Sequence, residues 1–126
     1  MARYADACNI GGSAENVRHK DEVLRRHCEE IGRDESEIAR TTGTGVIIIR
    51  DDPAEAQRVF EETFARNGKA RLWSNQRIGT VDTVVEQLRP YAEAGFRHFD
   101  VGFPAPYDAE TMERMITEVK PRLEAF

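Results

Sequence analysis

The residues of this chain best suited to binding a ligand are a glycine pair and a serine, Gly11-Gly12-Ser13. The segment before them, Ala5 to Ile10, is mostly small or apolar and predicts a short β-strand, and a helical pattern starts directly after them. Ser13 is therefore the predicted N-cap of that helix. The free N–H groups and the dipole of a helix N-terminus favour an anion, which glycines allow to approach the main chain. These residue types predict a phosphate site, and the alternative is an ordinary strand-to-helix turn.

The length and composition limit the classes of protein to which this chain can belong. With 126 residues, 40% of them hydrophobic and 33% charged, the chain has the size and balance of one globular α/β domain. Its net charge of −5, with both signs interspersed, argues against a nucleic-acid-binding surface, which needs a clustered basic face. No apolar stretch of the sequence reaches the length of a membrane span, so we expect no membrane partner.

The two cysteines, Cys8 and Cys28, fall on a predicted strand and on the apolar side of a predicted helix. The sequence contains neither a C-x-x-C motif nor the cysteine and histidine spacing of metal ligands, so we expect no metal site. Buried thiols of this kind are typical of a reducing compartment. Because Met1 leads into strand-like sequence without the apolar core of a signal peptide, we predict a cytoplasmic protein.

Apolar periodicity and turn residues predict strands that alternate with helices. The clearest strand is Thr44–Arg50, because its run Val46–Ile49 is apolar without alternation, as in a parallel strand covered on both faces. The loop Lys69–Ile78, which holds Trp73, is predicted to follow the second helix. The other predicted elements are the helices Ala14–Ile31, Pro53–Asn67, Gly79–Gly95 and Asp108–Pro121 and the strand His98–Phe103.

The order βα-βα-α-β-α predicts three parallel strands joined by right-handed helical crossovers. Four helices can cover only one face of so small a sheet. The other face, with Ala7, Ile47 or Ile48, and Val101, would then meet water, and the edges of the sheet would be open. The interior of a barrel, a partner chain or a further part of the polypeptide would cover that face.

Residues 3–34 and 77–106 resemble the C-terminal part of the luciferase-like monooxygenase family, most closely the actinobacterial branch that uses the deazaflavin coenzyme F-420 rather than FMN. The resemblance rests on the strand motif YADACN, the long helix after it, the helix start GTVDTVVEQL and the GF end of the last strand. It implies a TIM barrel of eight βα units, of which this single domain, residues 1–126, supplies the last three strands. The implied fold class is an α/β partial TIM barrel, completed by self-association or by a missing N-terminal part.

The resemblance also implies a site at the carboxyl ends of the strands, with coenzyme F-420 as the cofactor and FMN as the alternative. The residues that it places around the phosphate and ribityl group are Asn9, Ile10, Gly11, Gly12 and Ser13, with Gly79 and Thr80 at a second helix N-terminus. A purely structural interpretation is that Thr80 is an N-cap. At the end of the last strand, Phe103 and Tyr107 are candidates for the wall of a substrate pocket, and packing under the loop is the alternative.

Two function classes follow. The first is a luciferase-like flavin- or deazaflavin-dependent oxidoreductase that acts on a small molecule and is not active as an isolated monomer, because the earlier strands have no counterpart here. The alternative is a non-catalytic remnant that forms a homo-oligomer by burying Val46–Ile49, or a module that binds a phosphate ligand. No catalytic residue can be assigned, although Asp6 and Asp100 are expected to be buried and hydrogen-bonded within strands.

Overall fold

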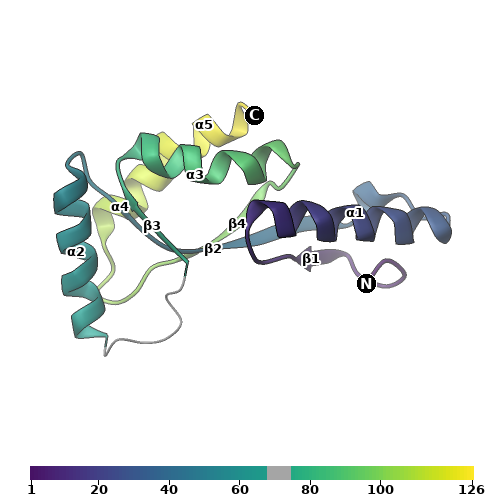
Figure 1. Ribbon diagram of the computed structural model, residues 1–126, viewed down its shortest axis with the longest axis horizontal. Coiled ribbons are helices and arrows are strands. Elements are labelled where there is room, and N and C mark those ends of the chain that lie inside the picture. The colour runs from purple at the N-terminus through teal and green to yellow at the C-terminus, as the bar shows by residue number, and fades with distance from the viewer. Residues whose placement is uncertain (68–74) are drawn as a thin grey trace. The chain divides into compact units, whose positions relative to one another are not determined.

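The computed structural model describes residues 1–67 and 75–126, which form two compact units. The first unit consists of Met1–Gly43 and Pro90–Asp100, and the second of Thr44–Arg89 and Val101–Phe126. The elements in chain order are β1 (Ala7–Asn9), α1 (Ala14–Glu30), a 3₁₀ turn (Glu35–Glu37), β2 (Ala39–Ile49), α2 (Pro53–Arg66), β3 (Gln76–Gly79), α3 (Val81–Glu93), β4 (His98–Gly102), α4 (Ala109–Arg114), a π-helical turn (Met115–Val119) and α5 (Lys120–Glu124) (Figure 1).

The long strand β2 is the partner of every other described strand. It runs parallel to β1, with Ala39 opposite Ala7, and parallel to β3, with Val46 opposite Gln76. Strand β4 also pairs with β2. The predicted α/β fold with parallel strands is therefore confirmed.

One strand was missed in the sequence. The predicted loop Lys69–Ile78 ends in β3, so the described elements follow the order βα-βα-βα-βα instead of βα-βα-α-β-α. Only Ile78 among the four residues of β3 is a large apolar residue, and the strand forms because β2 provides its partner: the Val46 N–H donates to the Asn75 carbonyl at 3.0 Å. Trp73 and the start of that loop lie outside the described residues.

Local signals correctly predicted the first helix. Ser13 occupies the N-cap of α1, and Gly32 follows the helix in the left-handed conformation, with φ of +68°. The N–H groups of Gly32 and Arg33 donate to the carbonyls of Glu29 and Cys28, which closes the last turn of the helix.

The core of the first unit lies between β1 and α1. Its buried apolar residues include Cys8, Ile10, Val17, Leu24, Cys28, Ile38, Tyr91 and Phe96. Burial raises the pKa of the Cys8 thiol, although the nearby Arg40 opposes the shift. Both cysteines are free and buried in the core, as the sequence predicted.

The strands of the first unit have an uncovered face. The predicted exposure of Ala7 is confirmed, and Asn9 on the same strand is exposed as well. The prediction that Asp6 and Asp100 are buried is wrong, because both are exposed. Asp100 accepts a hydrogen bond from the Asn9 amide at 2.8 Å, so the two strands β1 and β4 present a polar pair on the surface of this unit.

In the second unit, the apolar run of β2 is buried on both faces. Val46 and Ile48 pack against Ala56 and Phe60 of α2, and Ile47 is completely buried. The prediction that Ile47 or Ile48 meets water is therefore wrong, and so is self-association through Val46–Ile49. The reason is that the elements after β2 supply cover that the linear sequence does not show.

The last helix is irregular. Its inward residues are Thr111, Val119 and Leu123, whereas Met112 and Ile116 are 38% and 67% exposed. The π-helical turn holds one residue more than a regular turn, which shifts the buried face along the helix. The helix also continues through Pro121, which lies in α5 directly after the π-helical turn.

Candidate functional site

The turn between β1 and α1 is held together by side chains of the helix. The Ser13 hydroxyl accepts a hydrogen bond from the Asn16 N–H at 3.3 Å, which confirms Ser13 as the N-cap. The Asn16 side-chain amide donates to the Gly11 carbonyl at 3.2 Å, and the Lys20 ammonium lies 3.5 Å from the same oxygen. A positive charge is therefore held directly at the predicted phosphate turn.

The two glycines of this turn have different roles. Gly12 has a φ of +122°, and a Cβ there would lie 2.3 Å from the Asn16 amide nitrogen, so this position requires glycine. Its carbonyl also accepts a hydrogen bond from the Tyr91 hydroxyl at 2.9 Å. A Cβ on Gly11, in contrast, would meet nothing within 4 Å. Gly12 thus determines the conformation of the turn, whereas the turn has open space beside Gly11.

An open groove of about 520 Å³ lies beside this turn in the first unit. Its polar lining comes from Asn9, Asn16, His19, Lys20 and His27, and the predicted residue Ile10 also lines it. Four of these residues were not predicted as site residues: Asn16, His19, Lys20 and His27. Helical spacing could have identified them, because they stand at positions i, i+3, i+4 and i+11 on one side of a helix whose first turn was already a candidate.

The second predicted phosphate turn belongs to the second unit. Gly79 ends β3 with a φ of +150°, and its carbonyl accepts the Arg50 N–H at 3.0 Å. The Thr80 hydroxyl accepts a hydrogen bond from the Thr83 N–H at 3.2 Å, as an N-cap does. Capping of α3 therefore accounts for Thr80, and a role of Gly79 and Thr80 in phosphate binding stays a prediction.

The two aromatic candidates follow β4 in the second unit. Phe103 is half-buried and Tyr107 is 72% exposed. Their position directly after the strand is the predicted one, and their role as the wall of a substrate pocket stays a prediction.

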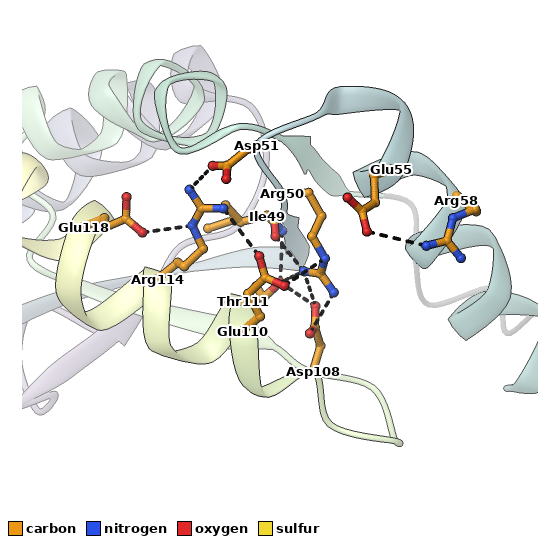
Figure 2. Close-up of polar contacts among 10 residues, drawn as sticks. All are labelled: Ile49, Arg50, Asp51, Glu55, Arg58, Asp108, Glu110, Thr111, Arg114 and Glu118. Atoms are coloured by element: carbon orange, nitrogen blue, oxygen red, sulfur yellow. Dashed lines mark hydrogen bonds and ion pairs between the residues drawn. The ribbon is translucent and has the colours of Figure 1, made fainter.

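A polar cluster at the end of β2 was not predicted from the sequence (Figure 2). The Arg50 guanidinium donates two hydrogen bonds to the Asp108 carboxylate, at 2.9 and 3.0 Å, and its Nε lies 3.2 Å from Glu110. The Thr111 hydroxyl donates to Asp108 at 2.6 Å and accepts the Ile49 N–H at 3.0 Å. This arrangement ties the carboxyl end of β2 to the start of α4.

The Arg50 cluster has a structural role. Burial of the carboxyl group opposes ionisation of Asp108, but the hydrogen bonds from Arg50 and Thr111 outweigh it, so the pKa of Asp108 lies below its ordinary value of 3.8. Arg50 also donates to the Ile49 carbonyl at 2.6 Å. The guanidinium therefore binds acceptors within the protein. The cluster therefore stabilises the fold and is not a candidate binding site.

Within residues 1–67 and 75–126, no three histidine, cysteine or acidic side chains are grouped closely enough to hold a metal ion. No helix in this part of the chain combines the length and apolar character needed to cross a membrane.

Comparison with known proteins identifies similar structures only. Neither the models of protein families nor the curated protein sequences give a match. Among solved structures, the long-chain alkane monooxygenase LadA is similar with a TM-score of 0.70 at 18% sequence identity, covering 98% of this chain and 37% of LadA. Riboflavin lyase RcaE, solved with modified FMN and its substrate riboflavin, gives a TM-score of 0.71 at 13% identity over 98% of this chain and 39% of its own.

A third similar structure is the coenzyme F-420-dependent tetrahydromethanopterin reductase of Methanopyrus kandleri, with a TM-score of 0.68 at 17% identity over 98% of this chain and 47% of the reductase. The chain thus spans less than half the length of each of these proteins. At this level of identity the similarity shows the fold. The resemblance inferred from the sequence is confirmed to that extent: nearly the whole chain has the α/β fold of part of a luciferase-like TIM-barrel enzyme.

Proposed function

We propose that this chain is the C-terminal portion of a luciferase-like barrel, a single domain over residues 1–126, and that it serves a flavin- or deazaflavin-dependent oxidoreductase. Its structural neighbours include one protein solved with modified FMN and one that depends on coenzyme F-420, which supports a cofactor of this class. Between the two cofactors, the sequence motifs favour F-420. The substrate is a small molecule, and the compartment is the cytoplasm.

The phosphate of the cofactor binds at Asn9–Ser13 in this proposal, and Gly79-Thr80 of the second unit stays a separate candidate helix N-terminus. The observation that carries it is the Lys20 ammonium held 3.5 Å from the Gly11 carbonyl, beside the open side of the turn. A lysine, a side-chain amide and free N–H groups at a helix N-terminus are the donors that a phosphate requires. When bound, the ring system of the cofactor supplies hydride chemistry, and this chain holds its phosphate end.

The test is a fluorescence titration of the purified chain with coenzyme F-420 and with FMN. Gly11→Asp places a like charge where the structure leaves space, and Lys20→Ala removes the cation; each is expected to weaken binding by about tenfold or more, the loss of a charge-assisted hydrogen bond. Lys120→Ala, an exposed lysine of α5, is the matched control and leaves the affinity unchanged. Gly12→Asp is unsuitable, because its side chain would collide with Asn16.

Two results would contradict the proposal. Equal affinity in the wild type, Gly11→Asp and Lys20→Ala would remove the phosphate site from this turn. Absence of binding to either cofactor at tens of micromolar would remove the oxidoreductase function.

The second candidate function is a non-catalytic remnant of the same fold that acts through self-association. The observation in its favour is the uncovered face of the first unit, where Ala7, Asn9 and Asp100 are exposed. A module that binds another phosphate ligand would use the same turn, and competition by inorganic phosphate in the absence of flavin affinity would distinguish it.

A further inference from the structure

The uncovered face of the first unit carries a polar pair, Asn9 of β1 and Asp100 of β4. The Asn9 amide donates to the Asp100 carboxylate at 2.8 Å, and both residues are exposed. The residues beside them on the two strands, Cys8 and Phe99, belong to the core that α1 covers, so the pair lies on the opposite face of the strands. In a barrel of parallel strands ringed by helices, the face opposite the helices is the interior.

A polar pair of this kind is unusual for the interior of a barrel. Interior positions are filled mainly by bulky branched apolar residues, and a carboxylate enclosed there needs hydrogen-bond donors. The Asn9 amide supplies one donor to Asp100, whereas a carboxylate has about four lone-pair sites. The pair therefore offers acceptors to a ligand that carries hydroxyl or N–H groups.

The place of the pair in the chain indicates which part of the ligand it meets. Asn9 is the last residue of β1, and it precedes by two residues Gly11, whose carbonyl lies 3.5 Å from the Lys20 ammonium. Two residues of chain span at most about 7 Å, which is close to the length of a ribityl chain. In flavin and deazaflavin cofactors the ribityl chain, with its free hydroxyl groups, joins the phosphate to the ring system.

We infer that Asp100, oriented by Asn9, accepts hydrogen bonds from the ribityl hydroxyl groups of the cofactor. This inference rests on the proposed function, and it adds a residue of β4 to a site that otherwise comes from β1, α1 and the turn between them. A carboxylate at this place selects a polyhydroxylated chain, because each hydroxyl donates a charge-assisted hydrogen bond. Since carboxylate and phosphate repel each other, the phosphate is left to Lys20.

The test compares two competitors of the bound cofactor, F-420 or FMN, in the fluorescence titration of the full chain. Ribitol 5-phosphate carries the phosphate and the polyol, and inorganic phosphate carries the phosphate alone. In the wild type, ribitol 5-phosphate is expected to compete about tenfold more strongly or better, because its hydroxyl groups reach Asp100. Asp100→Ala removes this advantage and leaves competition by inorganic phosphate unchanged, whereas Lys20→Ala weakens both competitors.

The matched control is Asp6→Ala, because Asp6 is an exposed aspartate of the same unit that precedes the amino end of β1. It leaves both competitors unchanged. Asp100→Asn keeps the shape of the side chain without its charge and should also lose most of the advantage. A wild type in which ribitol 5-phosphate is no stronger than inorganic phosphate, or an equal loss for both competitors in Asp100→Ala, would overturn the inference and leave the phosphate site standing. If the wild type binds neither cofactor, the proposed function fails together with the inference.

Discussion

Replacing Asp108 by asparagine is expected to lower the free energy of unfolding by about 3 kcal/mol, as is typical when one partner of a buried ion pair is removed. The side chains of Arg50 and Asp108 are only 11% and 16% exposed, so the guanidinium would lose the counter-ion that it binds with two hydrogen bonds and keep only the half-exposed Glu110. The Thr111 hydroxyl would also lose its carboxylate acceptor. Urea denaturation followed by circular dichroism measures the change.

The matched control is Asp51→Asn, since Asp51 also pairs with an arginine, Arg114, at 2.6 Å, but its side chain is 92% exposed. An exposed pair contributes roughly 0.5 kcal/mol, so this variant should be close to the wild type. Equal stability changes in the two variants would show that burial of the Arg50–Asp108 pair has no special effect.

The same pair predicts how stability depends on pH. The pKa of Asp108 is lower in the folded chain than its ordinary value of 3.8, so the folded state favours the ionised carboxylate. The stabilisation is therefore complete above the unfolded pKa and is lost as the pH falls through the folded pKa. The difference between the wild type and Asp108→Asn should accordingly be largest near neutral pH and shrink below about pH 4. A constant difference across this range would contradict the assignment.

The second large effect is expected at Gly45→Ala, with a loss on the order of 3 kcal/mol in the free energy of unfolding. Gly45 has a φ of +73°, and a Cβ would lie 1.9 Å from the Asn75 carbonyl oxygen, which is part of the main chain. That oxygen accepts the Val46 N–H, so relief of the clash separates β3 from β2.

Thermal unfolding and amide hydrogen exchange at Val46 measure the effect, and Gly43→Ala provides the control. A Cβ on Gly43 meets nothing within 4 Å, and its φ lies outside the left-handed range. Rapid exchange at Val46 in Gly45→Ala alone is the expected result. Retained protection at this amide would mean that β3 does not depend on Gly45.

The parts of the fold that local chemistry determines could be predicted from the sequence. The N-caps Ser13 and Asp52 and the left-handed Gly32 fix the ends of α1 and α2 within a few residues of themselves. The unbroken apolar run of β2 likewise indicated burial on both faces. Helix α2 was predicted as an element, but its packing on Val46 and Ile48 could not be, because that contact forms only when the chain folds.

The missed features all depend on residues far apart in the sequence. Strand β3 has little apolar character and exists through its pairing with β2. Arg50 and Asp108 are 58 positions apart, and Asp108 carried the local signal of a helix cap while its side chain binds Arg50. Lys20 is different, because its helical spacing from Ser13 was visible, and only the fold of the turn showed that it reaches Gly11.

The π-helical turn between α4 and α5 has a consequence for how the C-terminal segment can vary. Upstream of it, Thr111 is fixed by β2, and downstream Leu123 is fixed in the core while Arg122 pairs with Asp82 of α3 at 2.6 Å. The extra residue of the π-helical turn lets Thr111 keep its contact with β2 while Leu123 and Arg122 keep theirs. Gain or loss of a single residue between 115 and 119 would be absorbed there, whereas the same indel inside α2 would rotate Phe60 out of the interior.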